Sequence, residues 1–405
     1  MATGPIDVQA LIRTLSDEDL LAAADAYFTG LTPDSEQCHK PFSNPADAVH
    51  LHRNLALLLQ AADLFRGAHV LDLGCATGWL TLSLADLGCH VVGADISPQA
   101  IALARQVQAR RDTRPGGSAR FLAYDGRRLP LDEGSLDRVV CFDAFHHVRD
   151  PAATLGELAR VLRPGGRIAM VEPGPNHSRT PQSQAEMALY NVIENDVDMA
   201  QVAAAARAAG LGDPELLVQF PEPLVVPLDQ YLAWAAGPGL ADGDDRWVLA
   251  HLLGALTNTQ CFALTKGGSA VTDSRHPQAV AARLAIVDAA VVADGSGDVE
   301  FTVRVANTGE AVWILAEGVA GEVKLGVQLL GPDGSLHQRD FMRVPLHPAL
   351  AQPGSEQLVV FRVRRAEAPE LRLRLDLVAE QVAWFSQVGR TAPVDWPDAT
   401  KIRAS

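Results

Sequence analysis

A short stretch near residue 70 combines an acidic side chain with closely spaced small residues. In VLDLGCATGWL, residues 70–80, aliphatic side chains flank Asp72, and Gly74, Ala76 and Gly78 follow it. Small residues in the turn after a strand let the backbone approach a ligand closely. The carboxylate of Asp72 would repel a pyrophosphate but would attract a cationic or ammonium-bearing ligand. The stretch therefore predicts a turn that holds a nucleotide-like ligand carrying positive charge.

Two other interpretations of this turn stay open on these residues alone. A strand-to-helix turn can require glycine for backbone reasons, without any ligand. A nicotinamide dinucleotide would require the pattern G-x-G-x-x-G, which is not matched at Gly74, Ala76 and Thr77.

Three sites further along the chain narrow the choice. Asp95 ends the next apolar run, about twenty residues on, where a carboxylate can accept hydrogen bonds from both hydroxyls of a ribose. Asp125 offers an acceptor for an exocyclic amine, and the adjacent Gly126 lets a flat ring come close. RPGG, residues 163–166, turns the chain before another apolar run. Together these sites predict an adenosine with a charged tail.

At this point the sequence resembles the class I S-adenosylmethionine-dependent methyltransferases, over roughly residues 51–266. The motifs VLDLGCATG, GADIS, AYDGRRLP, CFDAFHHV and LRPGG carry the resemblance. It implies S-adenosylmethionine as the cofactor, with the first acid and the glycines at the methionine moiety, the second acid at the ribose and the third at the adenine. The implied cofactor residues are Asp72, Gly74, Cys75, Gly78, Asp95, Ile96, Asp125, Gly126 and Asp143. Ala76 departs from the family, in which glycine is commoner at this position.

The acceptor side is less well defined by the sequence. In-line methyl transfer to a hydroxyl requires a base that removes the proton, and such a base is expected near the ends of the fourth and fifth strands. The catalytic candidates there are His146, His147, Glu172 and His177. The residues do not select one of them, because a histidine here can equally pack under the cofactor.

Two polar segments have an open role. We expect Glu186, Tyr190 and Glu194 on one face of a helix. This face is either a solvated acidic stripe or a polar wall of the acceptor site that also holds a metal ion. Carboxylates alone do not fix a metal, so we predict no metal ligand. A loop near the N-terminus either closes on the acceptor or ties two helices to the sheet; its polar and aromatic residues are His39, Lys40, Phe42, His50, His52 and Arg53.

From Val70 onward, short apolar runs alternate with segments of helical periodicity, which is typical of parallel strands covered on both faces. Expected strands carry HVLDLG, HVVGADI, ARFLAYD, LDRVVCFDA, GRIAMVEP, ELLVQF and NTQCFALTK, and expected helices cover 7–28, 46–65, 79–87, 98–110, 152–162 and 182–210. Ser16 and Asp19 look like a helix-start cap. We predict an α/β fold with a doubly wound, seven-stranded, mostly parallel, Rossmann-like methyltransferase sheet. An insert containing Tyr231, Trp234 and Trp247 separates the last two strands.

Beyond a polar, Gly- and Ser-rich stretch the apolar pattern changes to period two, with turn signals such as NTG and PDG. This predicts an all-β, Ig-like sandwich. The expected boundaries are 1–66 for a helical cap or lid, 67–267 for the methyltransferase domain, 268–279 for a linker and 280–395 for the sandwich.

The sandwich is similar to domains appended to bacterial polysaccharide-processing enzymes, and the resemblance implies a glycan-related acceptor. Trp313, Trp384 and Phe385 either stack on sugar rings or form the core of the sandwich. Homodimerisation or docking to a partner through this domain is a further alternative.

Composition excludes several classes of protein. A formal charge of −15 disfavours nucleic acid as a partner. Five scattered cysteines without C-x-x-C spacing indicate free thiols rather than disulfides or a zinc site. The sequence shows no signal peptide and no apolar run of about 18 residues, so we expect no membrane span and a cytoplasmic location.

We therefore predict a methyltransferase that acts on a hydroxyl of a saccharide or glycan-related acceptor. The alternatives are methylation of a non-sugar natural product or an amine, and a glycan-binding scaffold without turnover. Asp72, Asp95 and Asp125 argue against the scaffold.

Overall fold

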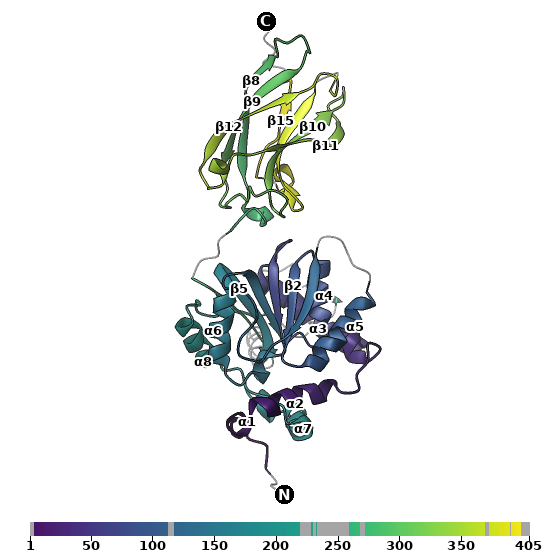
Figure 1. Ribbon diagram of the computed structural model, residues 1–405, viewed down its shortest axis with the longest axis vertical. Helices are drawn as coiled ribbons and strands as arrows, with labels where there is room; N and C mark the ends of the chain where they lie inside the picture. Colours follow the sequence, from purple (N-terminus) through teal and green to yellow (C-terminus); the bar gives the residue numbers. More distant parts are fainter. Residues whose placement is uncertain are drawn as a thin grey trace. The chain divides into compact units, whose positions relative to one another are not determined.

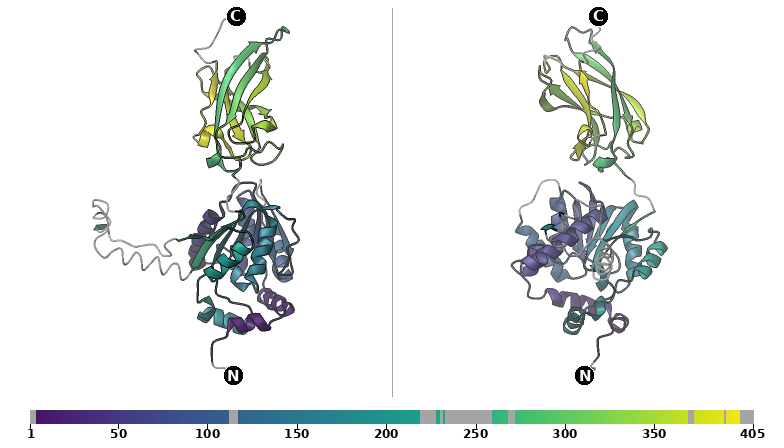
Figure 2. Two further views of the ribbon diagram at one scale, coloured as in Figure 1. Left: turned by 90° about the vertical axis from the view of Figure 1, so that its left-hand side faces the viewer. Right: turned by 180° about the vertical axis from the view of Figure 1, so that it is seen from behind.

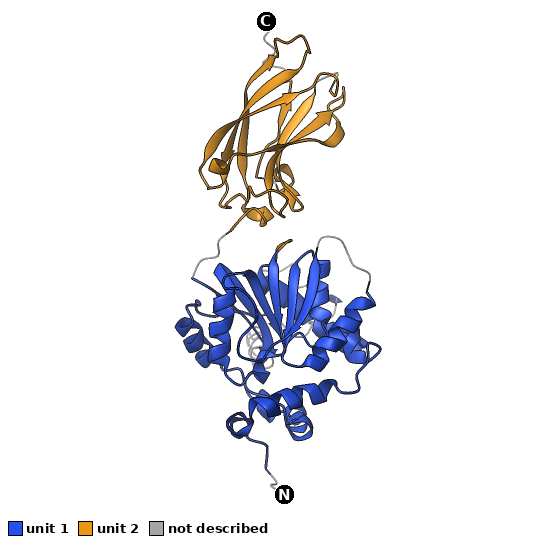
Figure 3. Ribbon diagram, in the orientation of Figure 1, with its two compact units in different colours: residues 1–64, 68–270 blue, residues 65–67, 271–405 orange. Residues whose placement is uncertain are grey.

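The computed structural model divides the chain into two compact units (Figure 3). One unit contains residues 1–64 and 68–270, and the other contains residues 65–67 and 271–405. The structure describes residues 4–111, 117–218, 259–267, 272–368, 372–388 and 390–397, together with 228, 229 and 232. The predicted insert residues Tyr231, Trp234 and Trp247, and residues 268–271 of the predicted linker, lie outside this part of the chain.

In the described part of the first unit, seven strands form one sheet in the order β3-β2-β1-β4-β5-β7-β6 (Figure 1). Their bounds are β1 His69–Leu73, β2 His90–Asp95, β3 Ser118–Ala123, β4 Leu136–Phe142, β5 Leu162–Pro173, β6 Glu215–Leu217 and β7 Thr259–Thr265. Strand β7 runs antiparallel to β5 and β6, whereas the pairs among β1 to β5 are parallel. The predicted fold class is confirmed.

Helices cover both faces of this sheet (Figure 1). α3 Pro45–Ala62, α4 Trp79–Asp86 and α5 Pro98–Ala109 lie on one face, and α6 Pro151–Val161 and α8 Met199–Ala208 lie on the other. β1 and β4 are buried on both faces, because consecutive residues such as Val70 and Leu71 both have 0% exposure. This double burial explains why these strands are apolar throughout rather than alternating.

Three helices gather at one end of the sheet, as Figures 1 and 2 show. They are α1 Val8–Thr14, α2 Asp17–Phe28 and α7 Pro181–Tyr190. The single helix expected over 7–28 is broken at Leu15, and a capping box restarts it: the Ser16 side chain accepts from the Asp19 N–H, and the Asp19 carboxylate accepts from the Ser16 N–H. The predicted helix-start cap is thus confirmed, and it divides the segment into two helices.

The prediction of one helix over 182–210 is wrong. α7 ends at Tyr190 because Asn191 adopts the left-handed conformation, with φ of 58°. Residues 191–198 are not helical, and α8 begins at Met199 with the Asp198 carboxylate as its cap. Glu194 therefore does not share a helix face with Glu186 and Tyr190.

The second unit contains two antiparallel sheets in its described residues. One has the order β11-β10-β13-β14 with β15 also paired to β13, and the other has the order β12-β9-β8. Their bounds are β8 Ala282–Val291, β9 Val299–Asn307, β10 Val323–Leu330, β11 Leu336–Pro345, β12 Glu356–Val363, β13 Leu373–Ala379, β14 Ala383–Trp384 and β15 Val394–Trp396. The sheets share one apolar core, to which Phe301 of β9 and Leu375 of β13 belong. The expected separate all-β region is present.

The aromatic side chains proposed for sugar stacking belong to the interior of this unit. Trp313, Trp384 and Phe385 are only 1%, 6% and 0% exposed. The Arg343 guanidinium lies 4.6 Å from the centre of the Trp384 ring. The stacking interpretation is therefore wrong for these residues, since none presents a free face to a ligand.

Candidate active site

The glycine-rich turn between β1 and α4 requires its small residues. Gly74, Ala76 and Gly78 have φ values of 71°, 45° and 80°, in the left-handed region that favours glycine. A Cβ atom on Gly74 would lie 2.5 Å from the Ala144 Cβ. The turn is therefore packed closely against the chain that follows β4.

Asp72 lies behind this turn rather than on its surface. It is 1% exposed, and its Oδ2 accepts a 2.6 Å hydrogen bond from the Thr81 hydroxyl. Burial raises the pKa of Asp72 to about 7, although the bond from Thr81 opposes this shift. Cys75 is also buried, and burial raises the pKa of its thiol well above the ordinary value, so it is an unreactive packing residue.

Asp95, the last residue of β2, joins two turns. Its Oδ2 accepts from the Ala76 N–H at 2.9 Å and its Oδ1 from the Ser97 N–H at 2.9 Å. Burial raises the pKa of Asp95, and these amide donors lower it in part. A carboxylate held at a fixed place beside the glycine-rich turn is suited to binding a diol.

The third acidic residue faces solvent. Oδ1 of Asp125 accepts from the N–H groups of Arg127 and Arg128 at 2.9 and 2.8 Å, and these bonds lower the pKa of Asp125. A Cβ atom on Gly126 would lie 3.5 Å from the Ile96 Cγ2. Ile96 and Gly126 are therefore neighbours at the ends of β2 and β3, as a binding site for a flat ring requires.

Helix α2 crosses the ends of these strands. Asp25 accepts a hydrogen bond from the Ser97 hydroxyl, and Asp17 pairs with Arg127 and, at 2.8 Å, with Arg149. The Thr77 hydroxyl donates to the Gln37 carbonyl at 3.0 Å. The sequence predicted an N-terminal cap but not these two acids, because on an exposed helix Asp17 and Asp25 resemble ordinary solvated charges.

The catalytic candidates meet at the ends of β4 and β5. Glu172, the penultimate residue of β5, is 1% exposed, and its two oxygens accept from the N–H groups of Ala144, Phe145 and His146 at 3.1, 2.9 and 3.2 Å. It also accepts from the His146 Nδ1 at 2.8 Å. Four donors leave Glu172 no free lone pair, so we interpret it as the residue that positions His146.

Glu194 lies at the centre of the histidines. Its Oε2 is 2.7 Å from the His177 Nε2 and 3.8 Å from the His146 Nε2, and its Oε1 is 3.4 Å from the His147 Nδ1. The sequence placed Glu194 on a helix with Glu186, whereas the non-helical segment 191–198 brings it here. The run of Asn and Asp in that segment was the available signal of a helix break.

Charges within this cluster shift its ionisation. Burial is the largest influence on His146 and lowers its pKa, but the hydrogen bond to Glu172 and the charges of Glu172, Asp143 and Glu194 together outweigh burial and raise the pKa to about 9. Desolvation and the charge of His146 lower the pKa of His147, although 44% of its side-chain surface is exposed. Burial opposes ionisation of Glu194, yet its hydrogen bond to His177 and the histidine charges lower its pKa.

Other polar groups surround the cluster. Asp143, with φ of 55°, follows β4 and places its Oδ1 4.0 Å from the His146 Nδ1. The ring centres of Tyr27 on α2 and Tyr190 on α7 are 5.7 Å apart, and burial followed by the charge of Glu186 raises the pKa of Tyr27. Tyr27 was not identified from the sequence.

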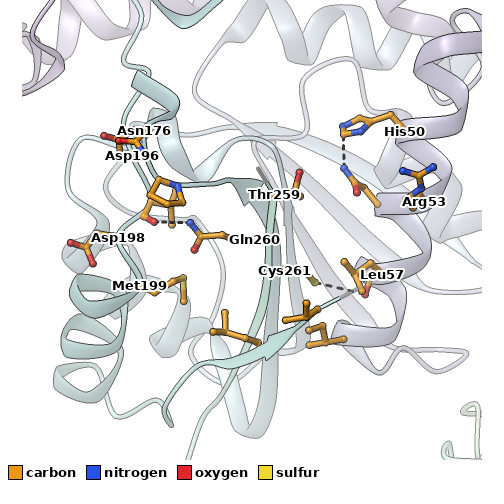
Figure 4. A pocket seen from close by; sticks show the side chains of 16 residues that line it. His50, Arg53, Leu57, Asn176, Asp196, Asp198, Met199, Thr259, Gln260 and Cys261 are labelled. Atoms are coloured by element: carbon orange, nitrogen blue, oxygen red, sulfur yellow. Dashed lines mark hydrogen bonds between the residues drawn. The ribbon is translucent and has the colours of Figure 1, made fainter. Parts of the chain in front are cut away.

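A pocket of about 520 Å³ lies beside β6 and β7 (Figure 4). His50, Arg53 and Asn54 of α3 line it together with Asp196, Asp198 and Gln260, while Leu216, Leu217 and Val218 add apolar surface. None of the predicted cofactor residues lines it. Of the N-terminal polar residues, His50 and Arg53 reach this pocket, whereas Phe42 is 73% exposed and packs on His52, with ring centres 4.7 Å apart.

In the part of the chain that the structure describes, no helix combines the length and apolar character needed to cross a membrane.

Comparisons with known proteins agree with this geometry. Residues 71–170 match the family model described as "Methyltransferase domain". The demethylmenaquinone methyltransferase of Thermus thermophilus is 35% identical over 150 residues, which are 36% of this chain and 64% of that protein. The ubiquinone biosynthesis O-methyltransferase of Aromatoleum aromaticum is 32% identical over 141 residues, 33% of this chain and 57% of that one. The chain thus spans less than two thirds of the length of either relative.

A solved S-adenosylmethionine-dependent methyltransferase from Mesorhizobium loti is 20% identical, with a TM-score of 0.38, and the match covers 54% of this chain and 97% of that one. The match of residues 71–170 to the methyltransferase-domain model, together with the strand order of the sheet, assigns this region of the chain to the class I, S-adenosylmethionine-dependent type.

Proposed function

We propose that the protein transfers a methyl group from S-adenosylmethionine to a hydroxyl oxygen of a small-molecule acceptor. One observation carries this proposal. The backbone at Ala144, whose side chain touches the glycine-rich turn, also donates to Glu172 in the histidine cluster. A site for a sulfonium nucleoside and a site for a proton acceptor therefore adjoin each other.

The residues that would hold the cofactor fit its chemistry. Asp95 offers a fixed carboxylate to the ribose hydroxyls, and Asp125 offers its second oxygen to the adenine amine. Ile96 and Gly126, neighbours at the ends of β2 and β3, would pack against the ring. Gly74 and Gly78 allow the backbone to approach the amino-acid end, whose ammonium group would favour the charged form of Asp72, a residue whose pKa burial raises to about 7.

The reaction is a displacement at carbon. When bound, the cofactor supplies a methyl group on a sulfonium, so that an acceptor lone pair forms the new C–O bond while the C–S electrons stay with sulfur. The acceptor hydroxyl loses its proton to a histidine of the cluster. His147 has the exposed side chain and the lowered pKa that suit this role, whereas His146 is held by Glu172.

For the acceptor we propose a saccharide or another polyhydroxylated molecule. The support is the pocket beside β6 and β7, where the side chains of His50, Asn54, Asp196, Asp198 and Gln260 offer several hydrogen-bonding groups. Quinols form a second candidate class, because one relative is named a demethylmenaquinone methyltransferase and another a ubiquinone biosynthesis O-methyltransferase. An amine acceptor would require less help from a base.

A methyl-transfer assay tests the proposal. The full chain would be incubated with S-adenosylmethionine labelled in its methyl group and a panel of sugar nucleotides, oligosaccharides, quinols and amines. We expect label on a hydroxyl oxygen, and a loss of about 100-fold in rate for His147→Ala, the range that a general base contributes. Transfer to nitrogen would contradict the hydroxyl acceptor, and no transfer to any class by a chain that binds the cofactor would favour a scaffold.

A further inference from the structure

The cluster at the ends of β4 and β5 combines imidazole and carboxylate groups at close range. His146, His147 and Glu194 each offer one potential ligand atom, and these atoms lie within 4.8 Å of one another. Imidazole nitrogen and carboxylate oxygen form a donor set that binds divalent transition-metal ions. The same side chains also occur together in hydrogen-bond networks without a metal. Two further observations distinguish a metal site from such a network.

The first such observation concerns Glu194. This residue is 2% exposed, and its Oε2 is bound to the His177 Nε2 at 2.7 Å. Within the described residues, the buried Oε1 has no hydrogen-bond partner. A buried carboxylate oxygen without a partner is costly, and a cation in front of it would remove that cost.

The second observation concerns the groups that surround the ligands. His146 directs its Nδ1 to Glu172 at 2.8 Å, which leaves the Nε2 for an ion on the side of Glu194. His177 fixes the other carboxylate oxygen of Glu194 in the same way. Metal sites commonly have such supporting groups: a carboxylate accepts from the second nitrogen of a ligand histidine, and a donor binds the second oxygen of a ligand carboxylate.

We propose that His146, His147 and Glu194 bind one divalent transition-metal ion of the zinc class. Bonds of 2.0–2.2 Å at tetrahedral angles place ligand atoms about 3.4 Å apart, so the side chains must move together by about 1 Å. Glu194 lies in the non-helical segment 191–198, and 44% of the His147 side chain is exposed. Both can therefore adjust, and an ion bound at the His147 Nδ1 would replace the 2.6 Å hydrogen bond that this atom makes to the Ile193 carbonyl.

The role of the ion rests on the proposed function. Three protein ligands leave a position open for the acceptor oxygen. Such an ion would lower the pKa of a hydroxyl held at that position, so that the hydroxyl would release its proton to solvent and offer its oxygen lone pair to the methyl carbon. The ion would thus take over the activation of the hydroxyl that a free histidine otherwise performs.

Titration calorimetry tests metal binding directly. The full chain, stripped with a chelator, would be titrated with zinc chloride, manganese chloride and magnesium chloride in the absence of cofactor. We expect one zinc ion per chain, no comparable binding of magnesium, and a visible absorption band when cobalt replaces zinc. His147→Ala and Glu194→Gln should each weaken zinc binding by at least about 100-fold, because loss of an outer partner alone costs 10–100-fold.

His337→Gln is the matched control, since His337 is an exposed histidine on β11. It should bind zinc as the wild type does, and thermal unfolding would show that the variants remain folded. Absence of stoichiometric binding in the wild type, or equal affinity in all variants, would overturn the proposal. The outcome is independent of methyl transfer, because a chain that binds zinc but transfers no methyl group contradicts only the proposed function.

Discussion

The two halves of the candidate active site are built in different ways. On the cofactor side, Asp95 and Asp125 are held by backbone N–H groups: Asp125 by residues two and three positions on, and Asp95 by Ser97 and by Ala76 in the neighbouring turn. On the acceptor side, buried side chains also hold one another: Glu172 binds the His146 imidazole in addition to three backbone N–H groups, and Glu194 binds the His177 imidazole.

This difference determines how each half tolerates change. Where backbone N–H groups bind a carboxylate, the fold of the strand and of the turn after it determines the position of that carboxylate. Where buried side chains hold each other, removing one leaves the others without partners and destabilises the fold. The acceptor side should therefore lose more stability on substitution than the cofactor side.

The largest effect is expected for Glu172→Gln. The amide presents donors to the N–H groups that the carboxylate now accepts from, and it leaves the buried His146 without its counter-ion. We expect a loss of about 3–5 kcal/mol in the free energy of unfolding, measured by urea denaturation. Glu186→Gln, at a half-buried neighbour, is the control and should change stability by less than about 0.5 kcal/mol. A similar small change in both variants would remove the contrast between the two halves.

An intermediate effect is expected at Asp72, as a dependence on pH. Its pKa is about 7 in the folded chain against an ordinary 3.8, so the folded state binds the proton more tightly. Stability should fall as pH rises towards and through 7, because the buried carboxylate then becomes charged. Between pH 5 and pH 8 this amounts to about 2–3 kcal/mol.

Asp72→Asn should remove this dependence. Urea unfolding without cofactor, at several pH values from 5 to 8, should show the variant gaining stability relative to the wild type as pH rises. Asp132→Asn, at an exposed position, should change stability equally at every pH. A constant difference between the wild type and Asp72→Asn across this range would contradict the buried carboxylate.

The smallest effect is expected at Ala76, where φ is 45°. The left-handed region costs a residue with a Cβ about 1–2 kcal/mol, and glycine loses about 0.5–1 kcal/mol through its entropy. Ala76→Gly should therefore stabilise the chain by up to about 1 kcal/mol, whereas the control Ala85→Gly inside α4 should destabilise it by a similar amount. Thermal unfolding measures both, and equal destabilisation would show that the turn is not strained.

The contrast also explains what could be predicted from the sequence. The strands from β1 to β5 and the positions of Asp95 and Asp125 follow from local apolar runs and from turns that immediately succeed them. The position of Glu194 was missed, because its helical periodicity with Glu186 is overridden by the break at Asn191, which only the Asn and Asp residues of 191–198 indicate in the sequence. The same is true of Trp313 and Trp384, since a period-two pattern does not show whether a tryptophan lies in the core or on the surface.

The identity of the acids as cofactor ligands remains the central claim, and Asp95 tests it most directly. Calorimetric titration with S-adenosylmethionine should give one site per chain for the wild type. For Asp95→Asn, with its fold checked by circular dichroism, binding should weaken by about 10–100-fold, because hydrogen bonds to a charged acceptor are lost. Absence of binding to the wild type, or equal affinity of the two proteins, would contradict the account.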